Sequence, residues 1–256
     1  MERRSVRAIV ASTVDFGEAD RVVRMLTPDG RVAAFAHGAR KSYRRFGGAL
    51  EPFSTIEVEL VTRRVDGMPT LSSASVTKPR LGLTSDLERL ALASYETEIS
   101  MLLAPEGAAS GEIFDALEAS LETLLGCPAT LESRVEFELR LFATSGYRPT
   151  LDRCARCALE LKELVFIDLA EGGALCGAHE AGVRVGPRTL AWLRAVLDDD
   201  PTRSSGEPGW SRTAAQKVLP ILHSARRQLL PSMPKSEQLL ADVGLDRAPP
   251  ATHRTR

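Results

Sequence analysis

The sequence has few cysteines and no long apolar run, and both shortages exclude whole classes of protein. Its 256 residues include only four cysteines, too few for the disulfide framework of a small secreted domain. No stretch approaches the roughly 18 uncharged apolar residues that a membrane-spanning helix needs. The charged start of the chain, residues 1–7, is not followed by the apolar core of a secretion signal. We therefore expect a cytoplasmic protein that has no membrane partner.

The net charge is also close to zero, at −1, but the charged residues are unevenly distributed along the chain. Residues 1–80 hold 14 basic and 9 acidic side chains, whereas the rest of the chain holds 19 basic and 25 acidic ones. A local basic excess favours an anionic partner for that part of the chain. A solvated surface that is merely uneven explains the same counts equally well.

The signatures of catalysis are also missing. The sequence contains neither the GxxxxGK[ST] phosphate loop nor the glycine pattern of a dinucleotide site. His37, His223 and His253 have no obvious nucleophile as a partner, and the acidic residues are scattered without a two-metal arrangement. The sequence favours a protein that is not an enzyme and has no small-molecule substrate.

What is present in residues 1–80 is the pattern of short β-strands. Between residues 56 and 61, apolar residues alternate with glutamates, as in a strand with one buried face. Thr-Pro-Asp-Gly at 27–30 predicts a tight hairpin, and Asp66-Gly67 predicts a second turn. The predicted strands are 5–14, 21–26, 31–36, 55–64 and 69–77. Five such strands suit a small closed barrel, because closure removes exposed edges.

From residue 85 onward the apolar spacing becomes helical. Ser85-Asp86 is an N-cap signal, and further helices are predicted over 111–125, 131–145, 187–197 and 212–230. Pro220 is expected to kink or split the last helix. We therefore predict an α+β protein: a β-barrel domain over 1–80 and a helical domain over 81–246. An irregular element at about 150–182 is inserted in the helical domain, and 247–256 form a disordered tail.

The irregular element carries two ligand pairs, Cys154-Ala-Arg-Cys157 and Cys176-Gly-Ala-His179. Two intervening residues let one tight turn direct both side chains at a single ion, and the 18 residues between the pairs can form a hairpin. Three thiolates and an imidazole complete a tetrahedral Zn²⁺ shell, which indicates one structural ion. Unligated, reduced cysteines are the alternative, and a redox role lacks the βαβ context that it needs. Cys127 stands alone and is expected to be a buried small hydrophobe.

The segment 36–48 carries four cations, no acid, two aromatics and three glycines. Arginine neutralises phosphate and stacks on bases, and aromatic rings add stacking platforms. Small five-stranded barrels bind nucleic acid on the face of strands 2 and 3 and through the 1–2 and 4–5 loops. The candidate DNA-binding residues are therefore Arg21, Arg24, Arg31, Arg40, Lys41, Arg44, Arg45, Arg63 and Arg64. A solvated loop, in which Phe46 and Phe53 only plug the barrel, is the alternative, and we expect Phe53 to be such a plug.

Several of these motifs together resemble the N-terminal signature of the RecO family of bacterial recombination mediators. They are Gly17-Glu18-Ala19-Asp20-Arg21, Leu26-Thr27, Gly30-Arg31, Gly38-Ala39-Arg40-Lys41, Arg45-Phe46 and Leu50-Glu51-Pro52-Phe53. The two ligand pairs match the zinc element of many family members, with His179 where the family often has a fourth cysteine. Arg44 stands where the family usually has a serine, which adds charge to the loop.

The resemblance implies an OB-fold protein that binds single- and double-stranded DNA and anneals complementary strands. It further implies a role in DNA repair and RecF-pathway recombination, near the nucleoid. There the protein would act with RecR to load recombinase onto DNA coated with single-strand-binding protein, SSB.

A second implication concerns the helical domain, on which RecO proteins recognise the acidic, hydrophobic C-terminal tail of SSB. The last long helix offers Arg226 and Arg227 beside four leucines, Leu219, Leu222, Leu229 and Leu230, which also suit an ordinary core. The alternative function is a helical adaptor that does not bind DNA and is stabilised by a structural zinc.

Overall fold

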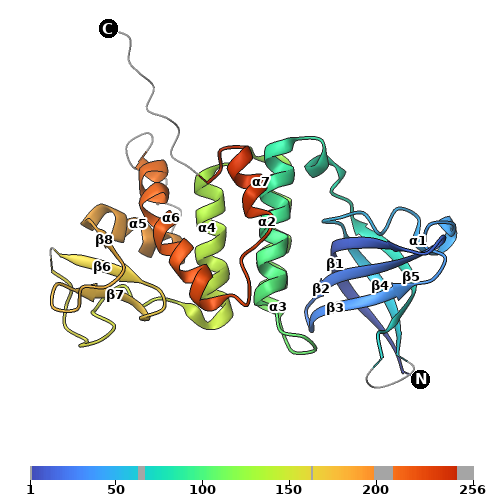
Figure 1. Cartoon of the computed structure of the whole chain (residues 1–256), viewed down its shortest axis with the longest axis horizontal. Helices are drawn as coiled ribbons and strands as arrows, with labels where there is room; N and C mark the ends of the chain where they lie inside the picture. Colours follow the sequence, from blue (N-terminus) through green and yellow to red (C-terminus); the bar gives the residue numbers. More distant parts are fainter. Residues whose placement is uncertain (1, 63–66, 163, 199–209, 247–256) are drawn as a thin grey trace, which may run out of the picture. The chain divides into compact units, whose positions relative to one another are not determined.

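The computed structural model describes residues 2–62, 67–162, 164–198 and 210–246 (Figure 1). Two compact units divide the chain, Met1–Pro128 and Ala129–Arg256. The first unit contains a β-barrel and the next two long helices, and the second contains the remaining helices and a small sheet. The barrel ends near residue 80, where the sequence predicts a boundary, and the division between the compact units comes later in the chain. The predicted tail, 247–256, lies outside the described residues.

Five strands close the barrel of the first unit. They are β1 (Glu2–Phe16), β2 (Asp20–Thr27), β3 (Gly30–Ala36), β4 (Thr55–Thr62) and β5 (Thr70–Lys78), in the order β1-β2-β3-β5-β4 around the barrel. β1 pairs with both β2 and β4, and its register with β2 shifts between Val10 and Ser12. β3 pairs in parallel with β5 and completes the ring. The predicted α+β fold with an N-terminal five-stranded barrel is confirmed.

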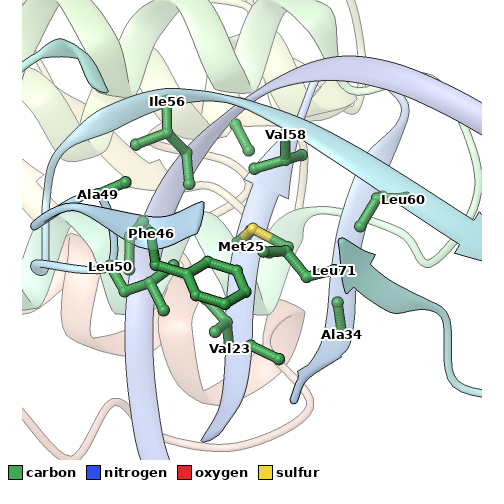
Figure 2. Close-up of a cluster of buried hydrophobic side chains, with 13 residues drawn as sticks. Val23, Met25, Ala34, Phe46, Ala49, Leu50, Ile56, Val58, Leu60 and Leu71 are labelled. Carbon is green, nitrogen blue, oxygen red and sulfur yellow. The ribbon is translucent and has the colours of Figure 1, made fainter. Parts of the chain in front are cut away.

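Alternate strand residues point inward and form the barrel core (Figure 2). Phe46, from the short helix α1 (Tyr43–Phe46), joins this core together with Ala49 and Leu50. Burial of a side chain of this kind contributes about 1.5–3 kcal/mol, so Phe46 anchors the loop between β3 and β4. Phe53 is also buried, at a φ of 69°, but it lies outside this cluster.

Two long helices follow the barrel in the first unit, after the single turn η1 (Leu81–Thr84). α2 (Leu87–Leu103) begins at the predicted N-cap, where the Asp86 side chain accepts a hydrogen bond from Arg89 N at 2.9 Å. α3 (Gly111–Gly126) buries an apolar face whose residues recur at helical spacing. The β2–β3 turn packs on the loop between these helices: Gly30 has a φ of 106°, and a Cβ there would lie 2.5 Å from Pro105 O.

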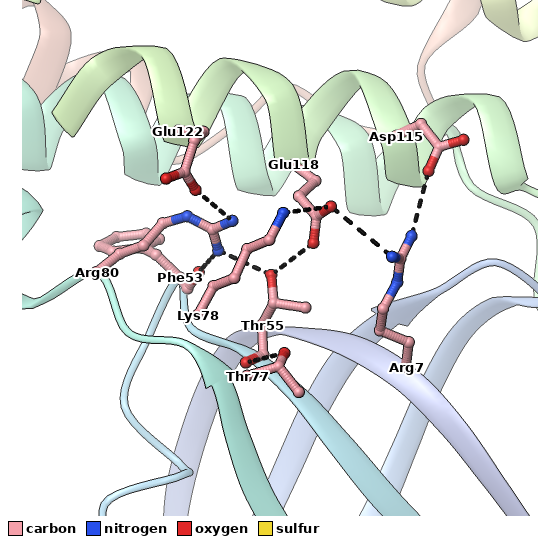
Figure 3. Close-up of polar contacts among 9 residues, drawn as sticks. All are labelled: Arg7, Phe53, Thr55, Thr77, Lys78, Arg80, Asp115, Glu118 and Glu122. Atoms are coloured by element: carbon pink, nitrogen blue, oxygen red, sulfur yellow. Dashed lines mark hydrogen bonds and ion pairs between the residues drawn. The ribbon is translucent and has the colours of Figure 1, made fainter. Parts of the chain in front are cut away.

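A polar seam joins α3 to the barrel (Figure 3). Asp115, Glu118 and Glu122 project from successive turns of the helix toward three basic side chains, Arg7, Lys78 and Arg80. The contacts are Arg7 Nη2 to Asp115 Oδ1 at 3.5 Å, Lys78 Nζ to Glu118 Oε2 at 3.0 Å, and Arg80 Nη2 to Glu122 Oε2 at 3.3 Å. The acidic face of this helix therefore covers basic side chains of the barrel.

Arg80 is the buried member of the seam, with 1% of its surface exposed. Its Nη1 donates to Phe53 O at 2.6 Å and to Thr55 Oγ1 at 2.9 Å, as Figure 3 shows. A buried guanidinium is costly unless its donors are paired. Nη1 and Nη2 of Arg80 have acceptors, whereas Nε has none among the described residues. Arg80 therefore binds the end of the barrel to α3 through hydrogen bonds rather than through apolar packing.

The second unit combines helices with a three-stranded sheet. Its helices are α4 (Leu131–Phe142), the turn η2 (Ala143–Tyr147), α5 (Pro187–Leu197), α6 (Trp210–Leu229) and α7 (Glu237–Asp242). The sheet has the order β7-β6-β8, from β6 (Val165–Asp168), β7 (Gly173–Cys176) and β8 (Val183–Val185). A capping box between Thr130 and Ser133 starts α4.

The sequence predicts a kink or a split at Pro220, and α6 runs through this residue as one helix, so it is not split there. Proline removes one backbone donor, but Val218, Ile221 and Leu222 around it are buried, and their packing holds the helix together. Among the described residues, no helix combines the length and the apolar content that crossing a membrane requires.

Candidate metal centre and basic surface

Four side chains able to bind a metal meet in the second unit. The ligand atoms of Cys154, Cys157, Cys176 and His179 all lie within 4.8 Å of one another. In the first pair, a tight turn places Ala158 at a φ of 59°, and its N–H donates to Cys154 O at 2.8 Å. In the second pair, His179 N donates to Cys176 O at 2.8 Å. Each turn thus directs both of its ligand side chains toward one point.

The distances within the group fit a tetrahedral zinc ion. Bonds of about 2.3 Å to sulfur and about 2.0–2.1 Å to nitrogen require S···S separations of about 3.8 Å and S···N separations of about 3.5 Å. Cys157 Sγ lies 3.8 Å from Cys176 Sγ. His179 Nδ1 lies 3.6 Å from Cys154 Sγ and 3.4 Å from Cys176 Sγ. These four residues could hold a metal with no position left for water.

The local electrostatics favour a thiolate at Cys154. Burial opposes its ionisation, but hydrogen bonds from the backbone N–H groups of Cys157, Cys176 and Arg156 outweigh burial and lower the pKa of Cys154 to about 5. For Cys157, a hydrogen bond from the Leu159 N–H lowers the pKa of the thiol. Burial and the thiols of Cys154 and Cys176 outweigh this effect, so the pKa of Cys157 is raised overall. A cation among the sulfur atoms would relieve this repulsion between thiolates.

The β6–β7 hairpin carries the second pair back to the first, within the segment where the sequence predicts a hairpin. β7 ends at Cys176, and Ala155 N, inside the first pair, donates to Ala174 O at 2.8 Å. Thr150 packs against the turn so closely that a Cβ at Gly173, where φ is 131°, would collide with its backbone. Backbone contacts therefore position both ligand pairs.

Cys127 takes no part in this group. It belongs to the first unit and is exposed, so the prediction that it is buried is wrong. α3 ends at Gly126, and Cys127 follows as the C-cap in extended conformation. The chain therefore leaves the buried face of α3 just before this residue.

The basic loop is folded against one end of the barrel. Gly38 N donates to Asp20 Oδ1 at 2.6 Å, and Arg45 Nη2 donates to His37 O at 2.7 Å. The Arg45 guanidinium also lies over the Phe46 ring, 5.1 Å from its centroid. Arg45 therefore has a structural role in addition to any contact with a ligand.

Cations surround a hollow of about 190 Å³ at this end of the barrel, lined by Arg21, Arg40, Lys41 and Tyr43 among others. Asp15 binds two of them, Arg21 Nε at 2.9 Å and Arg40 Nε at 3.5 Å. Lys41 and Arg44 are exposed and form no ion pair with any other residue that the structure describes. These two side chains are the cations most accessible to an anion.

Arg24 and Arg31 line a separate depression of about 370 Å³, next to α2. Glu98 and Glu106 also line it, and Arg31 Nη1 donates to Met101 O at 3.4 Å. The structure therefore does not group these two arginines with the loop cations. Arg63 and Arg64, the remaining candidates, lie outside the described residues. The sequence gives no local signal that these residues line one depression, because Glu98 and Glu106 follow Arg24 and Arg31 by 74 and 75 residues.

Comparison with known proteins gives matches along both units. The family profile described as "Recombination protein O N terminal" matches residues 1–80, and "Recombination protein O C terminal" matches 84–238. A DNA repair protein RecO of Myxococcus xanthus (strain DK1622) is 36% identical over 260 residues, covering 96% of this chain and all of the relative.

The chain belongs to the RecO family. Other RecO relatives include one from Anaeromyxobacter dehalogenans (strain 2CP-C), 43% identical over 77% of each chain. One from Geobacter metallireducens is 38% identical over 75% of this chain and 80% of the relative. The curated relatives are named DNA repair proteins. The RecO profiles meet between residues 80 and 84, where the barrel of the structure ends.

Proposed function

We propose that this RecO family protein is a recombination mediator that binds and anneals single-stranded DNA. It acts with RecR to load recombinase onto SSB-coated DNA, in repair and RecF-pathway recombination, on nucleoid DNA in the cytoplasm. It catalyses no covalent step. The observation that carries this proposal is the group of exposed cations at one end of the barrel, in a chain whose relatives are DNA repair proteins.

The proposed mechanism rests on phosphate neutralisation. Lys41 and Arg44 lack a competing carboxylate among the described residues, so a phosphate gains their full attraction. Arg21 and Arg40 share Asp15 and must divide their donors between that carboxylate and the DNA. Contacts to phosphate carry no sequence information, and they leave base edges free to pair. A protein that anneals any two complementary strands needs both properties.

The test is a salt titration of DNA affinity with the double variant Lys41→Ala/Arg44→Ala. Each phosphate contact contributes about −0.7 to the slope of log K against log salt on single strands and about −0.9 on duplex. The double variant should weaken binding to all sequences alike and reduce the slope by up to about 1.4 on single strands. Replacing Arg40 and Arg45 as well should extend the loss.

The matched control is Lys162→Ala/Arg184→Ala, which removes the same charge from exposed positions in the second unit. Its affinity and slope should equal those of the unaltered protein. Equal slopes for the loop variant and the control would place the DNA site elsewhere. Absence of any DNA affinity at low salt would favour the adaptor function.

We further propose that the SSB tail docks in a depression of about 670 Å³ in the second unit. Leu219 and Pro220 of α6 line it with the basic residues His223 and Lys235, and Glu237 and Asp246 line it as well. Its apolar and basic part suits a peptide that is both acidic and apolar. Leu222 and Leu230 belong to the core instead. A labelled tail peptide should bind the full chain, and Leu219→Asp should abolish the binding, whereas Arg227→Ala, which removes an exposed cation outside this depression, should not.

A further inference from the structure

The outer face of β1, β2 and β3 carries an exposed apolar patch, formed by Val14, Phe16, Val22 and Phe35. Val14 and Phe16 are 51% and 59% exposed, and Val22 and Phe35 are half-buried. Strand alternation explains their direction, because Val23 of β2 points into the core and its neighbour Val22 must point outward. Contiguous exposed apolar side chains of this kind are typical of an interaction site.

The patch is ordered by the sheet and by ring contacts. Val14 lies opposite Val22, and Val22 lies opposite Phe35, so one row crosses three strands. The Phe16 and Phe35 rings meet edge to face, with centroids 5.2 Å apart, and the His37 ring lies 4.5 Å from that of Phe35. Phe16 and Phe35 are thus held in place on strands, and His37 packs on Phe35 from the first position after β3.

Cations lie on both sides of the patch. Arg24 is the next outward residue of β2 after Val22 and is exposed. On the other side, beyond the ends of β1 and β3, Arg40 binds Asp15 and the carbonyl of Glu18, and Lys41 follows it. The row formed by Val14, Val22 and Phe35 itself contains no charged residue. Asp20, an acidic residue opposite Phe16, accepts a hydrogen bond from Gly38 N and lies 3.6 Å from His37 Nδ1. With that carboxylate engaged, apolar rings between cations match a ligand with flat apolar groups and a negatively charged backbone.

We propose that this patch binds unpaired bases of single-stranded DNA by stacking on Phe16 and Phe35, while the flanking cations bind phosphates. The inference rests on the proposed DNA binding and adds to it a preference for single strands, since duplex bases already stack on each other. A base stacked on an aromatic ring keeps its pairing edge accessible. The same contact therefore holds a strand and leaves it ready to anneal.

The experiment compares two single-stranded probes of equal length, oligothymidylate and an oligonucleotide of abasic sites, against the full chain. Phe16→Leu/Phe35→Leu keeps the patch apolar but removes its rings. It should weaken binding to oligothymidylate about 5- to 150-fold, the equivalent of 1–3 kcal/mol for one stacked base. Affinity for the abasic probe and the salt slope should not change. Tyr147→Leu, an exposed aromatic in the second unit, is the control.

Equal affinity of the variant and the unaltered protein for oligothymidylate would overturn the proposal, as would an equal loss on both probes. Sedimentation that shows a dimer only with the rings present, at unchanged DNA affinity, would assign the patch to self-association and overturn it too. Failure of the unaltered protein to bind either probe would instead refute the proposed DNA-binding function itself.

Photocrosslinking gives a readout that does not depend on folding of the variant. A strand containing 5-iododeoxyuridine should crosslink to peptides with Phe16, Phe35 or His37 in the unaltered protein. Crosslinks confined to residues 40–45 would contradict base stacking on the patch.

Discussion

At the scale of single residues, Tyr43 and Phe46 show how one loop can use its aromatic side chains in opposite ways. They are one helical turn apart in α1, yet Phe46 is 3% exposed and belongs to the barrel core, whereas Tyr43 is 86% exposed. For Phe46, the alternative interpretation of the sequence, a plug rather than a stacking platform, is therefore the one that the structure supports. Residue type alone cannot separate these roles, because both suit an aromatic ring next to arginine.

The metal site yields a prediction at this scale. We propose that Cys154, Cys157, Cys176 and His179 hold one structural zinc, whose binding supplies about 10 kcal/mol or more toward ordering the hairpin, less the cost of deprotonation. Elemental analysis should find one zinc per chain, lost in Cys154→Ser with a lower melting temperature and retained in Cys127→Ser. A metal-free protein whose melting temperature is unaffected by a chelator would refute the site.

Glu96 yields a prediction about pH. It is buried between α2 and α3, and burial raises its pKa to about 8, while a hydrogen bond from Ser120 Oγ at 2.8 Å offsets only part of this rise. In the unfolded chain the carboxyl ionises near pH ~4.3. Between these values the unfolded state loses the proton first, so the free energy of unfolding should fall from about pH 5 to about pH 8.

Glu96→Gln should remove this part of the pH dependence and stabilise the protein near pH 8 by at most roughly 5 kcal/mol. Urea titrations at several pH values measure the effect. Glu88→Gln, at an exposed position of the same helix, is the control and should leave the slope in place. A parallel pH profile for Glu96→Gln would show that Glu96 ionises normally.

At the scale of elements, α3 separates what the sequence could predict from what it could not. Apolar spacing predicts a helix over 111–125, and the structure has one there. Nothing in that spacing indicates that Asp115, Glu118 and Glu122 lie against the barrel, because their partners are 40 to more than 100 residues away. Local periodicity determines the element, whereas its partner depends on the tertiary arrangement.

The polar seam predicts unequal effects for two neighbouring cations. Arg80→Ala leaves Phe53 O without its buried donor and opens a cavity, so it should lower the free energy of unfolding by about 3–5 kcal/mol. Lys78→Ala removes a partly exposed ion pair and should cost about 0.2–1 kcal/mol. Denaturant titrations of both variants give the comparison, and similar losses would contradict the structural role of Arg80.

At the scale of the whole molecule, charge must be counted by unit rather than by segment. The basic excess of residues 1–80 is correct as a count, but residues 81–128 contain nine acidic side chains and one basic one. Both segments belong to the first unit, and several of these acids contact barrel cations or share a depression with them. The barrel segment is therefore basic by count. Its accessible cations are those of the loop between β3 and β4.

The contact between Arg80 and Glu122 also bears on synthesis by the ribosome. All five strands have been made once Lys78 is added, yet the seam that covers the barrel waits for Glu122, which follows 44 residues later. At about 5–20 residues per second, this interval lasts about 2–9 s. During that time Arg7, Lys78 and Arg80 lack the carboxylates of α3 that pair with them in the folded protein. Slow codons between residues 80 and 122 would lengthen this interval.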